Sequence, residues 1–211
     1  FTPNNQYIFS SGADGYVRRW PTTLTNSVTF DALSKAATSV AIHPNGSLIV
    51  VAGEDGSVKI LKRADGAEVH TLDGHAGRIS GVAFNRAGTQ VATIGADQIV
   101  RVFGVSDGKV LLESASAKSP LTSVMFSFDG KDVVVGTESG DVYAHALTEA
   151  AKFRSLSKRP KAVRAMATTS DGSRIVFAGD DKRLWIRDSV TGKTERGTEF
   201  EAVVTALAIS A

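Results

Sequence analysis

The stretch FNRAGTQVATIGADQIVRVF, from Phe84 to Phe103, decides the fold because close variants of it recur on both sides. Turn segments of the same kind, IHPNG, FNRAG, FSFDG and TTSDG, close on glycines 42 residues apart: Gly46, Gly88, Gly130 and Gly172. A second column agrees, with spacings of 41, 42, 42 and 42 residues between Asp14, Asp55, Asp97, Ser139 and Asp181. A fixed period of this length indicates a repeat architecture.

Each unit reads as short strands separated by turns. In the third unit the apolar-rich runs are ISGVAF, TQVATIG, IVRVF and KVLLES, so about 42 residues hold four strands and leave no room for a helix. The second run of each unit is apolar on both pleat faces, which is typical of a sheet covered on both sides. Asp65-Gly66 and Asp107-Gly108 predict two-residue hairpin turns.

The pattern predicts an all-β protein, a β-propeller of four-stranded antiparallel blades built from five repeat units of 41–42 residues. A β-sandwich is the alternative, but it does not explain so regular a period. We expect one domain with blades at about residues 1–32, 33–73, 74–116, 117–158 and 159–202.

The two ends of the chain leave the size of the ring open. Residues 203–211 match the first strand of a unit, and Phe1 aligns with the end of such a strand. Either this segment completes the first blade and closes a five-bladed ring, or the chain is part of a larger, seven-bladed ring, which we favour. In the second arrangement, the remaining blades of its own chain or a second copy would cover the apolar end faces.

Composition excludes several classes of partner. Lys plus Arg (24) nearly balance Asp plus Glu (22), giving a net charge of +2 and a mixed surface, so we expect no nucleic-acid partner. No apolar run approaches the roughly 20 residues that span a bilayer, so we expect no membrane association. The absence of cysteine fits the cytoplasm but leaves the compartment open.

The third unit resembles the WD-repeat β-propeller family in Gly74-His75, in VATIGAD and in VRVF. The resemblance implies a structural hydrogen-bond network of His, Ser or Thr, Asp and Trp. In the third unit these positions are His75, Thr93, Asp97 and Phe103, and Phe103 cannot take part. In the other units the network positions that the pattern retains are Ser10, Asp14, Trp20, Asp55 and Asp181, while the fourth unit has Ser139 and His145 instead.

No constellation of residues points to catalysis. There is no nucleophile elbow, phosphate-binding loop or dinucleotide fingerprint, and the four histidines are too far apart for a short metal motif. Asp180-Asp181 resembles a carboxylate pair, but Asp181 occupies the repeating turn position. We therefore expect no cofactor, no metal and no enzymatic activity.

The family resemblance predicts where a partner makes contact, because it implies that two sets of loops gather on one rim, where peptides dock. The first set holds Ala36, Arg78, Pro120 and Ala162, and the second holds Ala13, Glu54, Ala96, Glu138 and Asp180. The charged members Glu54, Arg78, Glu138 and Asp180 are the predicted partner-binding residues. Three carboxylates and one cation suit a basic peptide.

The sequence thus predicts a non-catalytic scaffold that binds a protein or peptide on the propeller rim. One alternative is a propeller enzyme or cofactor-binding protein of quinoprotein type, which a chromophore bound to the purified protein would indicate. Another is a sensor or architectural module of a larger multidomain polypeptide.

Overall fold

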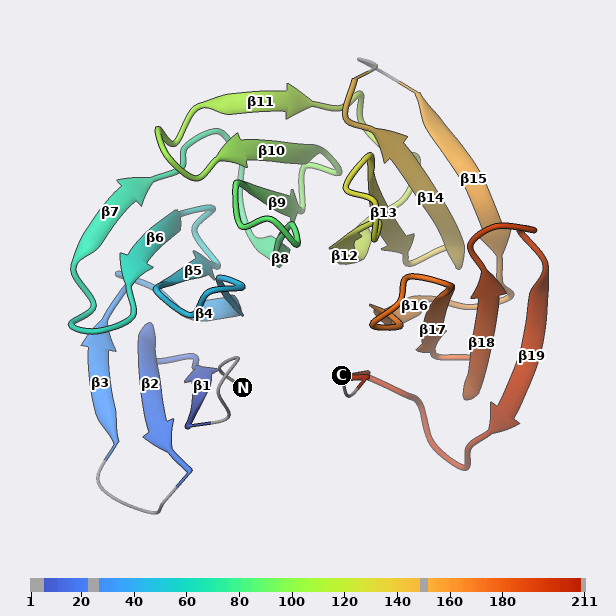
Figure 1. The fold of residues 1–211 in the computed structure, drawn as a ribbon, viewed down its shortest axis with the longest axis horizontal. Coiled ribbons are helices and arrows are strands. Elements are labelled where there is room, and N and C mark those ends of the chain that lie inside the picture. Colours follow the sequence, from blue (N-terminus) through green and yellow to red (C-terminus); the bar gives the residue numbers. More distant parts are fainter. Residues whose placement is uncertain (1–5, 23–26, 149–151, 210–211) are drawn as a thin grey trace.

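The computed structural model describes residues 6–22, 27–148 and 152–209, and these form five antiparallel sheets arranged along an arc (Figure 1). We call the sheets blades 1 to 5 in chain order. Blade 1 consists of β1 (Tyr7–Ser11), β2 (Tyr16–Pro21) and β3 (Val28–Asp31), and blade 2 of β4 (Ala37–Ile42), β5 (Leu48–Gly53), β6 (Val58–Lys62) and β7 (Glu68–Thr71). Blade 3 consists of β8 (Ile79–Phe84), β9 (Gln90–Gly95), β10 (Val100–Gly104) and β11 (Val110–Glu113). Blade 4 consists of β12 (Leu121–Phe126), β13 (Asp132–Thr137), β14 (Asp141–Ala146) and β15 (Phe153–Lys158), and blade 5 of β16 (Val163–Thr168), β17 (Arg174–Gly179), β18 (Arg183–Asp188) and β19 (Thr194–Glu199).

Within each blade, every strand pairs with the next strand in the chain, which is the meander expected from the turns. Blades 2 to 5 have four strands each, and blade 1 has three in the described part of the chain. The all-β repeat fold predicted from the sequence is therefore confirmed.

The core lies between successive blades. In β9 both pleat faces are buried, and Val91, Ala92 and Ile94 have no exposed surface. One apolar cluster joins Val50 and Ile60 of blade 2 to Phe103 of blade 3, and an equivalent cluster fills the next interface. Because full burial of such a side chain contributes about 1.5–3 kcal/mol, the interfaces between blades hold the arc together.

The turns between the last two strands of a blade are longer than predicted. Lys62 donates to the carbonyl of Ala67 at 2.8 Å and Gly66 donates to the carbonyl of Lys62 at 2.9 Å, so the loop has four residues. Gly66 alone adopts a positive φ, of 75°, and a Cβ there would collide with the Phe30 ring of blade 1. The two-residue turn was therefore wrong at this position: the glycine closes a longer loop and makes room for the neighbouring blade.

The arc stays open between blade 1 and blade 5 (Figure 1). Residues 203–209, expected to be a strand, form none in the described structure, because no strand edge is paired with them. The amide of Val204 instead donates to the carbonyl of Gly179 at 3.2 Å. On blade 1, Ile8, Tyr16 and Trp20 are 37%, 37% and 43% exposed, so this end face carries apolar surface. Within the described residues, no helix has the length and apolar character needed to cross a membrane.

Candidate functional site

The two predicted loop sets lie side by side on one rim of the blades. In each of blades 2 to 5, an amide of the turn after the second strand donates to a carbonyl of the segment before the first strand. These bonds join Glu54 to Ala36 (2.9 Å), Ala96 to Arg78 (2.7 Å), Glu138 to Pro120 (2.9 Å) and Asp180 to Ala162 (3.0 Å). In blade 1, the neighbouring Gly12 accepts from the amide of Ala37 at 2.9 Å.

The four charged rim residues fall into two groups. Arg78 Nη1 lies 3.7 Å from Glu54 Oε1, and both side chains are more than half exposed, at 61% and 51%. On the other side of the rim, Asp180 and Glu138 share a cation that the sequence analysis did not mark, Arg164. The rim therefore alternates carboxylates with arginines and is less acidic than the sequence predicted.

Arg164 holds Asp180 firmly and Glu138 loosely. Its Nε and Nη2 donate to the two carboxylate oxygens of Asp180 at 2.9 and 2.7 Å, whereas Nη2 lies 3.9 Å from Glu138 Oε1. The bond to Arg164 lowers the pKa of Asp180 below its usual value. Glu138 remains 55% exposed, so Glu54 and Glu138 are the two carboxylates most available to a ligand.

A column comparison would have found Arg164. Its position on the first strand of each blade is Thr38, Ser80 or Thr122 in blades 2 to 4. Ser80 and Thr122 donate their hydroxyls to the carbonyls of Leu121 and Val163 in the following blade. In blade 5, Arg164 replaces the hydroxyl residue whose hydrogen bond joins two blades. This difference from the equivalent residues of the other blades is the sequence signal that Arg164 has a role at the surface.

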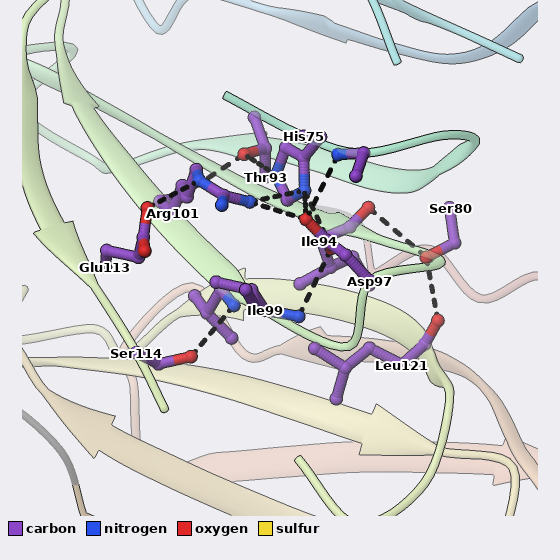
Figure 2. A network of polar contacts seen from close by, with 12 residues as sticks. His75, Ser80, Thr93, Ile94, Asp97, Ile99, Arg101, Glu113, Ser114 and Leu121 are labelled. Carbon is purple, nitrogen blue, oxygen red and sulfur yellow. Dashed lines mark hydrogen bonds and ion pairs between the residues drawn. The ribbon is translucent and has the colours of Figure 1, made fainter. Parts of the chain in front are cut away.

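Blade 3 contains the polar network that the family resemblance implied (Figure 2). His75 Nδ1 lies 2.9 Å from Asp97 Oδ1, and His75 Nε2 lies 2.7 Å from Thr93 Oγ1. The neutral tautomer with its proton on Nδ1 satisfies both contacts, since Nδ1 then donates to Asp97 and Thr93 donates to Nε2. The structure thus brings these three residues together, with Phe103 packed in the apolar core instead.

Arg101 completes this network from two residues before Phe103. Its Nη1 donates to Asp97 Oδ2 at 2.7 Å, and its Nε donates to Glu113 Oε2 at 2.9 Å (Figure 2). The side chains of His75, Arg101 and Asp97 are only 1%, 7% and 10% exposed. Sequence reasoning missed Arg101 because the family pattern places the fourth member at position 103.

The network shifts the proton affinities of its members. Burial lowers the pKa of His75 and outweighs the opposing bond to Asp97. Burial would raise the pKa of Asp97, but the bonds to Arg101 and His75 outweigh it, so the pKa is lowered. At neutral pH the network therefore holds a neutral imidazole between the Asp97 carboxylate and the Thr93 hydroxyl, with Arg101 bonded to the same carboxylate.

The aspartates at the repeating turn position each accept the same kind of hydrogen bond. Asp14, Asp55, Asp97 and Asp181 each accept from the amide two residues later, at 3.1–3.3 Å. Trp20 Nε1 donates to Ser10 Oγ at 2.9 Å, so these two members of the first unit are in contact. In blade 4, Ser139 bonds Asp141 and His145 is fully buried beside Phe153.

The Asp180-Asp181 pair is divided between two partners. Asp180 binds Arg164, whereas Asp181 accepts from Trp185 Nε1 at 2.7 Å. Within the part of the chain that the structure describes, no three His, Asp or Glu side chains are grouped so as to hold a metal ion. The arrangement on the rim presents fixed charges on rigid loops and can bind a ligand of complementary charge.

Comparison with known proteins agrees with this architecture. The family model described as the anaphase-promoting complex subunit 4 WD40 domain matches residues 4–85. An uncharacterized WD repeat-containing protein of Synechocystis is 28% identical over 142 residues, covering 64% of this chain and 39% of that protein. The periodic tryptophan protein 2 homolog of Schizosaccharomyces pombe is 28% identical over 190 residues, covering 79% of this chain and 22% of that protein.

A third relative, the serine-threonine kinase receptor-associated protein of Gallus gallus, is 27% identical over 172 residues, covering 80% of this chain and 47% of that protein. The chain therefore spans between about a fifth and a half of the length of these relatives. Proteins of this kind generally act as interaction scaffolds that bind other proteins, and they are typically non-catalytic. In its period, its blades and these matches, the chain is therefore similar to proteins of the WD40 repeat family.

Proposed function

We propose that this chain is a non-catalytic scaffold that binds a basic peptide segment of a partner protein on the rim bearing Glu54 and Glu138. The observation that carries the proposal is the bonding of the two loop sets to each other in four successive blades. Loops fixed in this way present their charges with little conformational freedom, which lowers the entropy lost on binding.

The roles of the four rim residues differ. Glu54 and Glu138 meet their arginine partners only at 3.7 and 3.9 Å and are about half exposed, so a lysine or arginine of a ligand can compete for them. Asp180 is already bound through both oxygens by Arg164 and positions that guanidinium. Arg78 and Arg164 in turn favour ligands that alternate cations with an acidic or polar residue.

The test starts from peptides selected on the wild-type chain from a random peptide library, with dissociation constants measured by fluorescence polarisation. The charge-reversed double variant Glu54→Lys with Glu138→Lys should bind basic selected peptides about tenfold more weakly, or about 1.4 kcal/mol. A matched control, Glu68→Lys with Glu195→Lys, changes the net charge equally on the outer strands β7 and β19.

Two results would contradict the proposal. One is a set of selected peptides that carries no excess of Lys and Arg. The other is an equal loss of affinity in the rim variant and in the outer-strand control, since that would indicate attraction by net charge and not by the rim.

A further inference from the structure

A cavity of about 310 Å³ lies between blades 4 and 5 at the rim opposite to Glu138 and Asp180. Its position follows from strand direction, because β13 begins at the cavity with Asp132 and ends at Thr137, next to Glu138. The floor is apolar and consists of Val134, Ala144, Leu156 and Ile175, and two arginines, Arg154 and Arg187, line the cavity together with it.

The cavity exists because small or polar side chains replace large apolar ones at equivalent repeat positions. Between blades 2 and 3, 84 residues earlier, the positions of Ala144, Thr168 and Arg187 are occupied by Ile60, Phe84 and Phe103. Ile60 and Phe103 are 0% and 1% exposed and fill that interface, with Phe84 packed against them. The same backbone arrangement thus holds a filled apolar core between blades 2 and 3 and an open cavity between blades 4 and 5.

Arg187 brings a positive charge into this cavity without a carboxylate to balance it. Its Nη1 donates to the carbonyl of Gly192, and among the described residues no carboxylate lies within ion-pair distance of it. Two carboxylates also line the cavity: Asp132 is paired with Arg154 at 2.7 Å, and Asp129 lies 3.7 Å from Lys131 Nζ. Arg187 is therefore the lining cation that has no ion-pair partner among the described residues. Burial, and then the nearby Arg154, lower the pKa of Arg187, and a guanidinium nevertheless stays protonated. An anion placed beside Arg187 would therefore be stabilised.

Apolar surface continues beyond the cavity. Phe128 and Val190 both line it and are 38% and 90% exposed. The guanidinium of Arg86 stacks over the Phe128 ring at 4.3 Å from its centre, which holds that ring in place. A free small molecule would fill the cavity alone, whereas a peptide would also cover this flanking surface.

We propose that the cavity between blades 4 and 5 binds a peptide segment of a protein partner in which an acidic residue adjoins an aliphatic one. The aliphatic side chain fills the apolar floor, the carboxylate pairs with Arg187, and the flanking residues pack on Phe128 and Val190. This site lies on the opposite rim from the proposed basic-peptide site and is independent of it.

The test is a titration of the whole ¹⁵N-labelled chain with acetyl-Gly-Leu-Glu-Gly amide, followed by NMR. The expected result is saturable shifts of the Ser189 and Val190 amides and of Arg187 Nε. The peptide with Gln in place of Glu should bind at least tenfold more weakly, because it cannot pair with the Arg187 guanidinium. Hexanoate, which supplies only the carboxylate and an aliphatic chain, should also bind at least tenfold more weakly than the Glu peptide.

Two variants plug the cavity with the residue types found in the filled interface. Ala144→Ile alters the floor without changing charge, and Arg187→Phe removes the cation as well. Each should abolish the saturable shifts while the remaining spectrum shows a folded chain, and should either variant fail to fold, Arg187→Gln tests the charge alone. Arg196→Gln, on the exposed strand β19, is the control and should bind as the wild type does.

Three results would overturn the proposal. Equal affinity for the Glu and Gln peptides would remove the role of Arg187. Wild-type binding by folded cavity variants would place the peptide elsewhere. Equal affinity for hexanoate and the Glu peptide would make the cavity a site for a small carboxylic acid instead of a peptide.

Discussion

Blades 3 and 5 solve the same packing problem with different chemistry at equivalent positions. In blade 3, the positions 75, 93, 97 and 101 hold His, Thr, Asp and Arg, which form a buried charged network. In blade 5, 84 residues later, Arg159, Phe177, Asp181 and Trp185 occupy these positions. The guanidinium of Arg159 stacks on Trp185 at 4.1 Å from the ring centre, and Trp185 donates to Asp181 at 2.7 Å.

These four positions therefore differ between the two blades as a set and not one at a time. The aspartate is common to both blades, but the cation and its partner have exchanged places across it. Phe177 has no hydroxyl, so a histidine at position 159 would lose the partner that Thr93 gives to His75. Arg159 finds other partners: it stacks on Trp185 and its Nη2 donates to Ser157 Oγ at 2.7 Å, while its Nε is buried without a hydrogen bond among the described residues.

The largest predicted effect is at the shared aspartate. Asp97→Asn should lower the free energy of unfolding by about 3 kcal/mol, because it removes the carboxylate that Arg101 Nη1 and His75 Nδ1 bond and leaves Arg101 only the half-exposed Glu113. Asp181→Asn should cost about 1 kcal/mol, since the asparagine oxygen can accept from Trp185 or from the Arg183 amide but not from both, and no ion pair of Asp181 is broken among the described residues. Urea unfolding of both variants at neutral pH makes the comparison, and equal losses would show that the two aspartates have the same role.

The second prediction is that the blade 5 pair can be transplanted only as a pair. His75→Arg alone places two cations beside Asp97, and Arg101→Trp alone removes the cation that pairs with it, so each should cost about 2 kcal/mol. The double variant should lose at least about 1 kcal/mol less than the sum, because the new arginine can stack on the new tryptophan. A double-mutant cycle measured by urea unfolding checks this, and strict additivity would contradict it.

The repeat and its antiparallel strands were readable from the sequence because turn glycines and alternating apolar runs have local causes. The family resemblance also located His75, Thr93 and Asp97, which the structure brings together. Arg101 was missed because its role depends on Glu113 from a neighbouring strand. The replacement of a hydroxyl by Arg164 is a signal in the sequence, but its pairing with Asp180 is not. Only the register between strands brings such pairs within bonding distance.

The cavity between blades 4 and 5 was hidden for a related reason. Ala144 and Arg187 are unremarkable singly, and their effect appears only when both are compared with the side chains that fill the other interfaces. The strand predicted for residues 203–209 was wrong for the opposite reason. Its local sequence pattern fits a strand, but a strand needs a neighbouring strand edge to pair with.

The third prediction concerns pH and separates the two blades further. The pKa of His75 is lowered mainly by burial, so between pH 7 and 5 the unfolded chain binds a proton at this residue more readily than the folded chain. The stability that the neutral histidine provides is therefore complete above its ordinary pKa and is lost as the pH falls below it. Asp97, whose pKa is also lowered, adds a loss that begins only at more acidic pH.

Urea midpoints measured from pH 7.5 to 5 should fall for the wild type and fall less for His75→Gln. Arg159→Gln in blade 5 is the matched control, because the position carries no titrating group in this range and should keep the wild-type slope. The same slope in wild type and His75→Gln would contradict the assignment of a neutral, buried His75.

The smallest predicted effect is in blade 1, where the hydroxyl equivalent to that of Thr93 belongs to Ser10. Trp20 and Ser10 keep the tryptophan-to-hydroxyl bond that blade 3 lacks, but Trp20 is 43% exposed on an uncovered face. Ser10→Ala should therefore cost only about 0.5 kcal/mol, because water can replace the hydroxyl. Thr93→Val, which removes the buried hydroxyl at the equivalent position of blade 3, should cost about 2 kcal/mol since it leaves His75 Nε2 unsatisfied. If the Ser10 variant loses as much as the Thr93 variant, the outer face of blade 1 must be covered in solution, and the mass of the chain by light scattering would then show what covers it.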